Sequence, residues 1–233
     1  MNLYDLIRTM QILQTSVARG FHRWTDGFVR FDRAEAFAEK LQAIYHANPS
    51  GPVDLRLRRQ GVARVKLVMC AVPAHLGFRW WLLASEGTGL VTTRETLHDA
   101  LDRDHRIALG DFELVRLPRG ARPAWTWRLP TAHFETRLAY AEAVATHRGP
   151  ELAQAVIADM RRWPGFAGLR AQRKAIWQAM AAARFRAGRD DALAFPLQQP
   201  WPRRLSLQGH ATPLAVAAER MRTTVNDSEG RKP

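Results

Sequence analysis

The sequence predicts an α+β fold in which an antiparallel sheet, at about residues 53–129, is packed by N-terminal helices and followed by an α-helical C-terminal segment. Strand-like runs of apolar residues, several of them alternating with polar ones, are concentrated in residues 53–129. The segments on either side show the apolar spacing of amphipathic helices. Short turn sequences separate neighbouring extended runs, which favours antiparallel pairing. With 233 residues, of which 46% are hydrophobic, the chain is long enough for one core with a helical appendage.

Three segments are expected along the chain. Residues 1–130 should form the α+β core that contains the sheet, and residues 131–190 should form a helical segment packed on it. Residues 191–233 should form an extended, partly disordered basic tail, because Pro, Gln and Arg dominate its first part and polar residues dominate its end.

Two helices are predicted ahead of the sheet. Apolar residues at helical spacing indicate the first over residues 3–19, and a capping box of Asp32 and Glu35 starts the second, which stops at residues 48–52. The aromatic residues between the two helices indicate either a loop packed on the core, which we favour, or part of a stacking surface; they are Phe21, Trp24, Phe28 and Phe31.

The centre of the predicted sheet is a hairpin over residues 61–85, the densest apolar segment of the chain. Turn chemistry at residues 73–77 separates its strands, and the adjacent Trp80 and Trp81 must point to opposite faces. A further strand over residues 53–58 should precede this hairpin. Alternation is expected to place a basic group mostly on one exposed sheet face: Arg56, Arg58, Arg64 and Lys66, with Arg79 beside them.

Beyond the hairpin, the pattern changes from mixed to helical. Thr92 and Glu95 cap a helix expected over about residues 93–103, and a second hairpin over 106–117 and an extended run over 124–129 complete the sheet. Alanine-rich helices follow from Thr131. The second of these helices should bury Leu152, Val156 and Met160, and the last should bury Leu169, Ile176, Met180 and Ala183.

The charge balance favours a polyanionic partner. The chain has 35 Lys and Arg against 22 Asp and Glu, a formal net charge of +13, and nearly all of the excess is arginine. Because the planar guanidinium group binds phosphate through two parallel hydrogen bonds and stacks on bases, this bias suits nucleic acid, DNA or RNA. A basic soluble protein and a protein at an anionic membrane surface are the alternatives.

Several classes are disfavoured by what the sequence lacks. The single Cys70 excludes an intramolecular disulfide and a cysteine-based zinc site, and it lies in an apolar strand where an inert core residue is expected. We find no secretion signal and no apolar run long enough to span a membrane, so a cytoplasmic protein with no membrane partner is expected. No nucleotide-binding or nucleophile motif occurs, so no cofactor is expected.

One cluster resembles a metal site, and it consists of His98, Asp99, Asp102, Asp104 and His105. Two carboxylates and an imidazole one helical turn apart could hold a divalent cation. Interleaved arginines would compete for these carboxylates, and an exposed helix face has the same composition. We therefore expect no metal site, and an enzyme is less expected than a binding protein.

Two further basic surfaces are candidate phosphate contacts. Arg119 and Arg122 occupy a turn between two strands, where a basic tip can reach a minor groove or phosphates. The last helix should expose a stripe of cations with one stacking ring, namely Arg170, Arg173, Lys174, Trp177 and Arg184.

The leading hypothesis is a non-catalytic nucleic-acid-binding accessory protein, of the kind found in a nucleoprotein complex or a bacterial mobile element. The first alternative is a protein–protein adaptor subunit that uses exposed Trp and Arg as anchors. The second is a metal-dependent nuclease.

Overall fold

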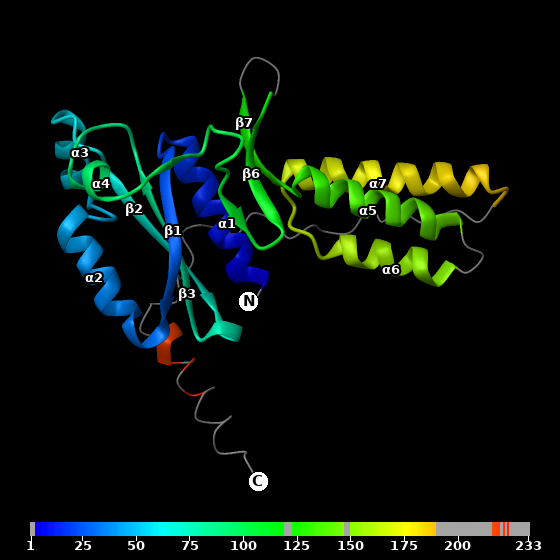
Figure 1. Ribbon diagram of the computed structural model, residues 1–233, viewed down its shortest axis with the longest axis horizontal. Coiled ribbons are helices and arrows are strands. Elements are labelled where there is room, and N and C mark those ends of the chain that lie inside the picture. Colours follow the sequence, from blue (N-terminus) through cyan, green and yellow to red (C-terminus); the bar gives the residue numbers. More distant parts are fainter. Residues whose placement is uncertain are drawn as a thin grey trace, which may run out of the picture. The chain divides into compact units, whose positions relative to one another are not determined.

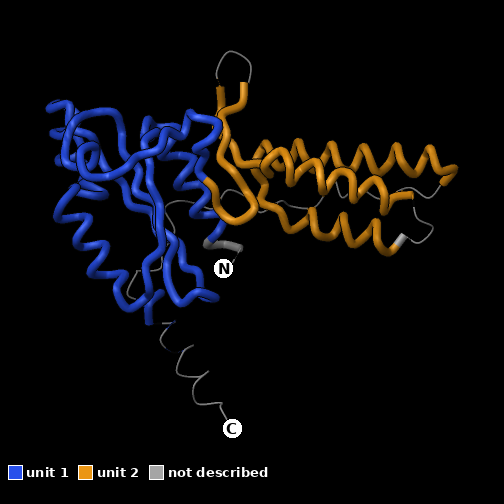
Figure 2. Tube along the Cα trace, in the orientation of Figure 1, with its two compact units in different colours: residues 1–107, 205–233 blue, residues 108–204 orange. Residues whose placement is uncertain are grey.

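The structure, a computed structural model, describes residues 3–118, 123–146, 150–189, 216–219, 221 and 223. It confirms the α+β fold with antiparallel sheets and a C-terminal helical segment (Figure 1). The chain divides into two compact units, one of residues 1–107 with 205–233 and one of residues 108–204 (Figure 2). The division falls at Ile107, whereas the sequence indicated a boundary at residue 130.

The sheet of unit 1 has the strand order β2-β3-β1-β4, with every neighbouring pair antiparallel. Strands β2 (Val65–Val72) and β3 (Gly77–Ala84) form the predicted central hairpin. The 3-10 turn Pro73–His75 connects them, and Leu76 closes the turn in the left-handed region. As expected from alternation, Trp81 is fully buried on one face while Trp80 lies on the other.

Strand β1 (Arg23–Arg30) occupies the segment predicted as a loop. It lies inside the sheet, between β3 and β4 (His98–Asp99). Gly27 weakens the strand pattern in the sequence, but the structure requires a glycine there, because a Cβ would lie 2.6 Å from the indole of Trp80. The aromatic segment is therefore part of the sheet, and Trp24 is buried in the core.

Helices cover both faces of this sheet (Figure 1). Helix α1 (Leu3–Ala18) packs along β2 and buries Met10 and Leu13. Helix α2 (Ala34–Tyr45) covers the opposite face through a core cluster that includes Leu41 and Tyr45. A later part of the chain joins this side, where Met221 packs with Ala34 and Phe78.

Residues 53–58 were predicted as a strand, and this prediction was wrong. They belong to helix α3 (Gly51–Arg59), which begins at Gly51-Pro52 with proline in the first turn. The alternation of Leu and Arg did not reflect a sheet face, because Leu57 is buried while Leu55 is 48% exposed. Arg56 and Arg58 consequently lie on a helix.

The helix expected over residues 93–103 is also absent. Helix α4 (Leu90–Arg94) has a single turn, and the chain then enters β4. Side chains of the following segment compete with helical hydrogen bonding, because the carboxylate of Asp99 accepts from the N–H of Leu101 at 2.9 Å and that of Asp102 from Asp104 at 3.0 Å.

Unit 2 begins with the sheet β5-β6-β7, formed by Ala108–Leu109, Phe112–Leu117 and Ala124–Arg128. The predicted helices follow as α5 (Thr131–Thr146), α6 (Pro150–Arg161) and α7 (Ala167–Arg186). Helices α5 and α7 lie side by side (Figure 1).

Helix α6 packs in a different rotation from the one predicted. Met160 is buried as expected, but Leu152 is 52% exposed and Val156 is half-buried. Ala153 and Ile157 are buried in their place. The buried side of α6 therefore includes Ala153, which the sequence pattern did not distinguish from the exposed alanines of the same helix.

Candidate nucleic-acid interface

The basic residues of the central sheet do not form the exposed platform that alternation predicted. Arg64 is half-buried; it forms an ion pair with Asp54 at 3.5 Å, and its guanidinium lies 4.7 Å from the ring centre of Phe21. Arg79 donates to Asp26 at 2.6 Å and lies over the ring of Trp81. Both guanidinium groups are therefore held by the fold itself.

Lys66 is half-buried, on the same sheet face as the buried Trp81. Burial lowers the pKa of its ammonium group, and the nearby charge of Arg19 lowers it further. Lys66 is therefore not part of a fully exposed basic face. The prediction that Arg56, Arg58, Arg64 and Lys66 share one exposed sheet face was therefore wrong.

A compact group of exposed arginines occurs instead at the end of α3. Arg56, Arg58 and Arg59 are all exposed in its last turn, and we call them the α3 arginine cluster. Within the part of the chain that the structure describes, none of the three forms an ion pair. The negative end of the helix dipole favours cations at this position.

Sequence reasoning missed Arg59 because the predicted strand ended at Arg58. On a helix, neighbouring residues are separated by about 100 degrees and can share one broad exposed surface. The signal that could have indicated the helix was the pair Gly51-Pro52, which is typical of a helix start.

The basic tip between β6 and β7 was the second candidate surface. Arg119 and Arg122 lie outside the described residues. The strands on either side pair antiparallel as predicted, with Leu117 opposite Ala124. The role of the tip stays a prediction.

The basic stripe of α7 is divided by the structure. Arg170 and Lys174 are exposed and Trp177 is half-buried, but Arg173 and Arg184 are 1% and 2% exposed. The expectation that all four cations face solvent was therefore wrong.

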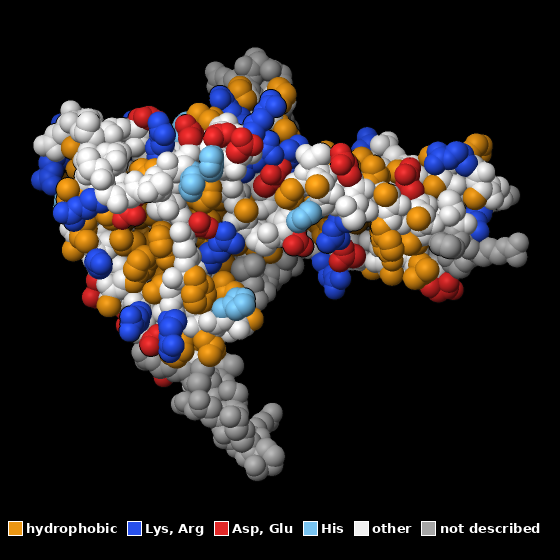
Figure 3. All heavy atoms as spheres, viewed as in Figure 1, with side chains coloured by type: hydrophobic (Ala, Val, Ile, Leu, Met, Phe, Trp, Pro, Cys, Tyr) orange, Lys and Arg blue, Asp and Glu red, His pale blue; other side chains and the backbone are white. Residues whose placement is uncertain are grey.

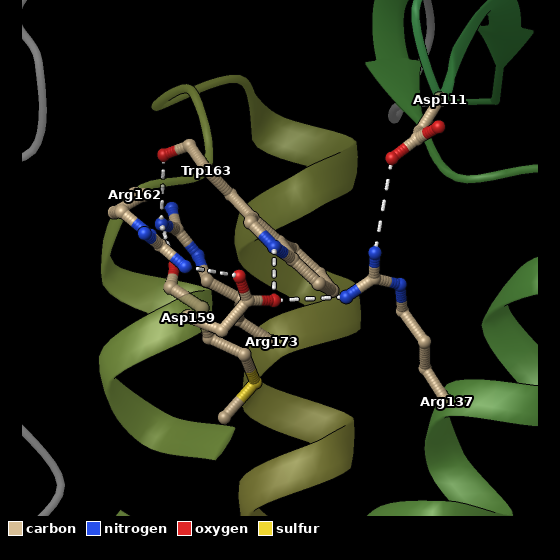
Figure 4. A network of polar contacts seen from close by, with 7 residues as sticks. Asp111, Arg137, Asp159, Arg162, Trp163 and Arg173 are labelled. Carbon is tan, nitrogen blue, oxygen red and sulfur yellow. Dashed lines mark hydrogen bonds and ion pairs between the residues drawn. The ribbon is translucent and has the colours of Figure 1, made fainter. Parts of the chain in front are cut away.

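The two buried arginines bind the ends of other helices. Nη1 of Arg173 donates to the carbonyls of Met160 and Trp163, each at 3.1 Å, where α6 ends (Figure 4). Nη1 of Arg184 lies 3.4 Å from the carbonyl of Ala145 in the last turn of α5. Carbonyls at a helix end have no intrahelical donor, so each guanidinium acts as a C-terminal cap.

The buried arc of α7 is wide because the helix packs against both α5 and β7. Gly168 donates its N–H to Thr126 in β7 at 3.0 Å, and the amide of Gln172 bonds both backbone groups of Leu129. Burial lowers the pKa of Arg173 to about 10, with a contribution from Arg170, so the group is still charged at neutral pH.

The carboxylate and histidine cluster is arranged around ring stacking. The rings of His98 and His105 are stacked with centres 4.6 Å apart, and Nδ1 of His105 lies 2.9 Å from the carboxylate of Asp102. This contact lowers the pKa of Asp102. Among the described residues, no group of three or more His, Cys, Asp or Glu side chains is placed to hold a metal ion.

Comparisons with protein-family models, with curated proteins and with solved structures gave no match for this chain. None of the helices in the described ranges combines the length and the apolar character that crossing a membrane requires. As expected, Cys70 is buried in the core.

Proposed function

We propose that this protein binds nucleic acid without cleaving it, and that the α3 arginine cluster supplies phosphate contacts. The observation that carries the proposal is the exposure of Arg56, Arg58 and Arg59 in one helical turn, without ion pairs in the described part of the chain. The net charge of +13 gives the whole molecule the sign that a polyanion attracts.

Guanidinium groups on one turn suit a phosphate backbone. Each can bind phosphate oxygens through two parallel hydrogen bonds, and each neutralised phosphate releases counterions. Phosphate contacts carry no sequence information, so we expect binding with little sequence preference. Arg119, Arg122, Arg170, Lys174 and Trp177 belong to the other unit and stay separate candidate contacts, and a cytoplasmic location is proposed as well.

A titration with a matched charge control tests the proposal. Affinity for duplex DNA, single-stranded DNA and RNA is measured at two salt concentrations for the protein and for a triple variant, Arg56→Ala, Arg58→Ala and Arg59→Ala. The variant should bind more weakly, and its salt slope should shrink by roughly one unit for each lost phosphate contact.

The control variant changes three exposed arginines outside α3, namely Arg33, Arg103 and Arg161, to alanine. This control removes the same net charge, so a general charge effect would weaken nucleic-acid binding equally in both variants. Equal loss of affinity in both variants would show that α3 is not the interface. The proposal is overturned if the protein binds none of the three nucleic acids at low salt.

An adaptor role is the second candidate, and one observation favours it. Phe185, in the last turn of α7, is 83% exposed, and Tyr140 and Leu152 are also exposed on the same unit. Exposed aromatic side chains can anchor protein interfaces. Under this reading, Phe185→Ser would abolish co-elution with the partner subunit, while affinity for nucleic acid would be unchanged.

A further inference from the structure

A cavity opens on the α2 side of the sheet in unit 1. Its volume is about 570 Å³, within the range of about 300–1,000 Å³ that is typical of small-molecule sites. Phe37 and Ile44 of α2 line it, together with Trp80 of β3. The space-filling view shows hydrophobic side chains gathered between α2 and β1 (Figure 3).

The aromatic part of this cavity is a pair of half-buried rings. The rings of Trp80 and Phe37 have centres 5.1 Å apart and are tilted by 43°. The indole of Trp80 lies directly over Gly27, which leaves it no room to sink further into the sheet. The cavity therefore offers aromatic surface on which another flat ring can stack.

A donor and an acceptor are placed in the same cavity. The hydroxyl of Tyr45 donates to the carboxylate of Glu95, and both residues line the cavity. Burial and this hydrogen bond raise the pKa of Tyr45 to about 12, so the phenol keeps its proton at neutral pH. An ionised carboxylate has more acceptor positions than one hydroxyl can fill, so Glu95 can also accept N–H groups from a ligand.

Two cations complete the lining. Lys40 of α2 and Arg94 of α4 are both exposed and both border the cavity. Neither forms a hydrogen bond or an ion pair with any residue of the described ranges through its side chain. A ligand that fits this site carries a flat ring, N–H donors for Glu95 and a negative charge for Lys40 and Arg94.

We propose that this cavity binds a nucleotide, with its base stacked on Trp80 and Phe37, its N–H edge on Glu95 and its phosphate on Lys40 and Arg94. Stacking on aromatic rings, base-edge hydrogen bonds and cationic phosphate contacts are the means by which proteins bind unpaired nucleotides. The ligand is either a free mononucleotide or a nucleotide of a single strand. The cavity shares no residue with the α3 arginine cluster, so this inference stands independently of it.

Calorimetric titration of the full chain with four ligands tests the site: guanosine monophosphate, uridine monophosphate, ribose 5-phosphate and a short single-stranded oligonucleotide. Guanine has adjacent N–H donors on its pairing edge, so the guanine nucleotide should bind about ten-fold more tightly than the uracil nucleotide, and both more tightly than the sugar phosphate.

Two variants separate the base contact from the phosphate contacts. Glu95→Gln keeps an acceptor for Tyr45 but loses the charge, and should weaken guanine nucleotide binding by about ten-fold or more. Lys40→Ala with Arg94→Ala should weaken both nucleotides about equally. The matched controls are Glu39→Gln, an exposed carboxylate of α2 that does not line the cavity, and Arg33→Ala with Arg103→Ala. Neither control should change affinity.

Each result of these titrations either supports one form of the proposed site or overturns it. Binding of the free nucleotides identifies a mononucleotide site, and binding of the oligonucleotide alone identifies a single-strand site. The proposal is overturned if neither the free nucleotides nor the oligonucleotide bind at millimolar concentration. It is also overturned if the Glu95 and Lys40/Arg94 variants bind nucleotides as tightly as the control variants do. The α3 triple variant should bind guanosine monophosphate normally, so failure of one proposal is distinguishable from failure of the other.

Discussion

Arg173 of α7 donates to the carbonyl of Met160 over 3.1 Å and so joins the first half of α7 to the end of α6. The same guanidinium reaches the carbonyl of Trp163 at the same distance. A side chain that is 1% exposed thus carries a positive charge to the negative end of a neighbouring helix.

Replacing Arg173 with Ala should lower the free energy of unfolding by about 2–4 kcal/mol, because two carbonyls lose their donor and a buried side chain leaves a void. Lys174→Ala is the matched control, since Lys174 is exposed and adjacent. It should stay within about 0.5 kcal/mol of the parent. Urea denaturation followed by circular dichroism measures both, and equal effects would contradict the capping role.

Gly27→Ala should destabilise the protein by about 1–3 kcal/mol, as expected when a methyl group is forced into a packed position. The added Cβ would lie 2.6 Å from Trp80, whose ring is fixed between Gly27 and Phe37. At Gly51 the same substitution meets nothing within 4 Å and should be nearly neutral. Thermal melting of the two variants provides the comparison, and an unchanged Gly27→Ala protein would contradict the packing of Trp80.

Asp159 should contribute to stability in a pH-dependent way. Burial alone would raise the pKa of its carboxyl, but hydrogen bonds from Arg162 and Arg137 outweigh burial and lower it (Figure 4). A lowered carboxyl pKa gives a contribution that is present above the ordinary value and lost as the pH falls through the folded value. Because the side chain is 39% exposed, screening limits this contribution to roughly 1 kcal/mol.

The variant Asp159→Asn tests this expectation. At neutral pH it should unfold at lower urea than the parent, and the two midpoints should converge as the pH is lowered into the acidic range. A gap that stays constant with pH would show that packing, and not the charge of Asp159, accounts for the difference.

The hydroxyl of Tyr45 should lose its proton only at high pH. Burial and the hydrogen bond to Glu95 raise its pKa to about 12, so one of the 3 tyrosines should titrate near that value in the folded protein. The stability linked to the protonated phenol is complete below the unfolded pKa of about 10 and is lost as the pH rises through about 12. Ultraviolet difference spectra recorded against pH should show this ionisation of Tyr45, and the Tyr45→Phe variant should lack it.

The central hairpin was predictable from local pattern alone. Two apolar runs, Val65–Val72 and Gly77–Ala84, flank a turn that begins at Pro73, so the apolar pattern and the turn chemistry agree. Strand β1 was not predictable in this way, because Gly27 weakens its pattern and only Trp80, fifty-three residues later in the chain, explains why glycine is needed there.

The misassigned helix α3 shows the limit of short patterns. Six residues that alternate in polarity also fit a short helix, in which Val53 and Leu57 lie one turn apart on the same side. Periodicity cannot separate the two over such a length. The exposed cluster was therefore found in part, with Arg56 and Arg58 but without Arg59.

The stripe on α7 was misplaced for a different reason. Arg173 lies four residues after Leu169 and Arg184 lies four residues after Met180, so helical spacing puts both cations beside the buried arc. There they reach carbonyls at two helix ends. Partners that distant in sequence are not visible in a helix pattern. The cavity beside Trp80 was missed on the same grounds, since α2, β3 and α4 meet only in the folded chain.

Because α7 supplies donors to end carbonyls of both α5 and α6, detachment of α7 would leave those carbonyls without these partners. Local fraying of these ends is thereby linked to an opening of the whole helical unit. Amide protons near Ala145 and Met160 should exchange with deuterium at the same free energy as those in the middle of α7, as members of one cooperative unit.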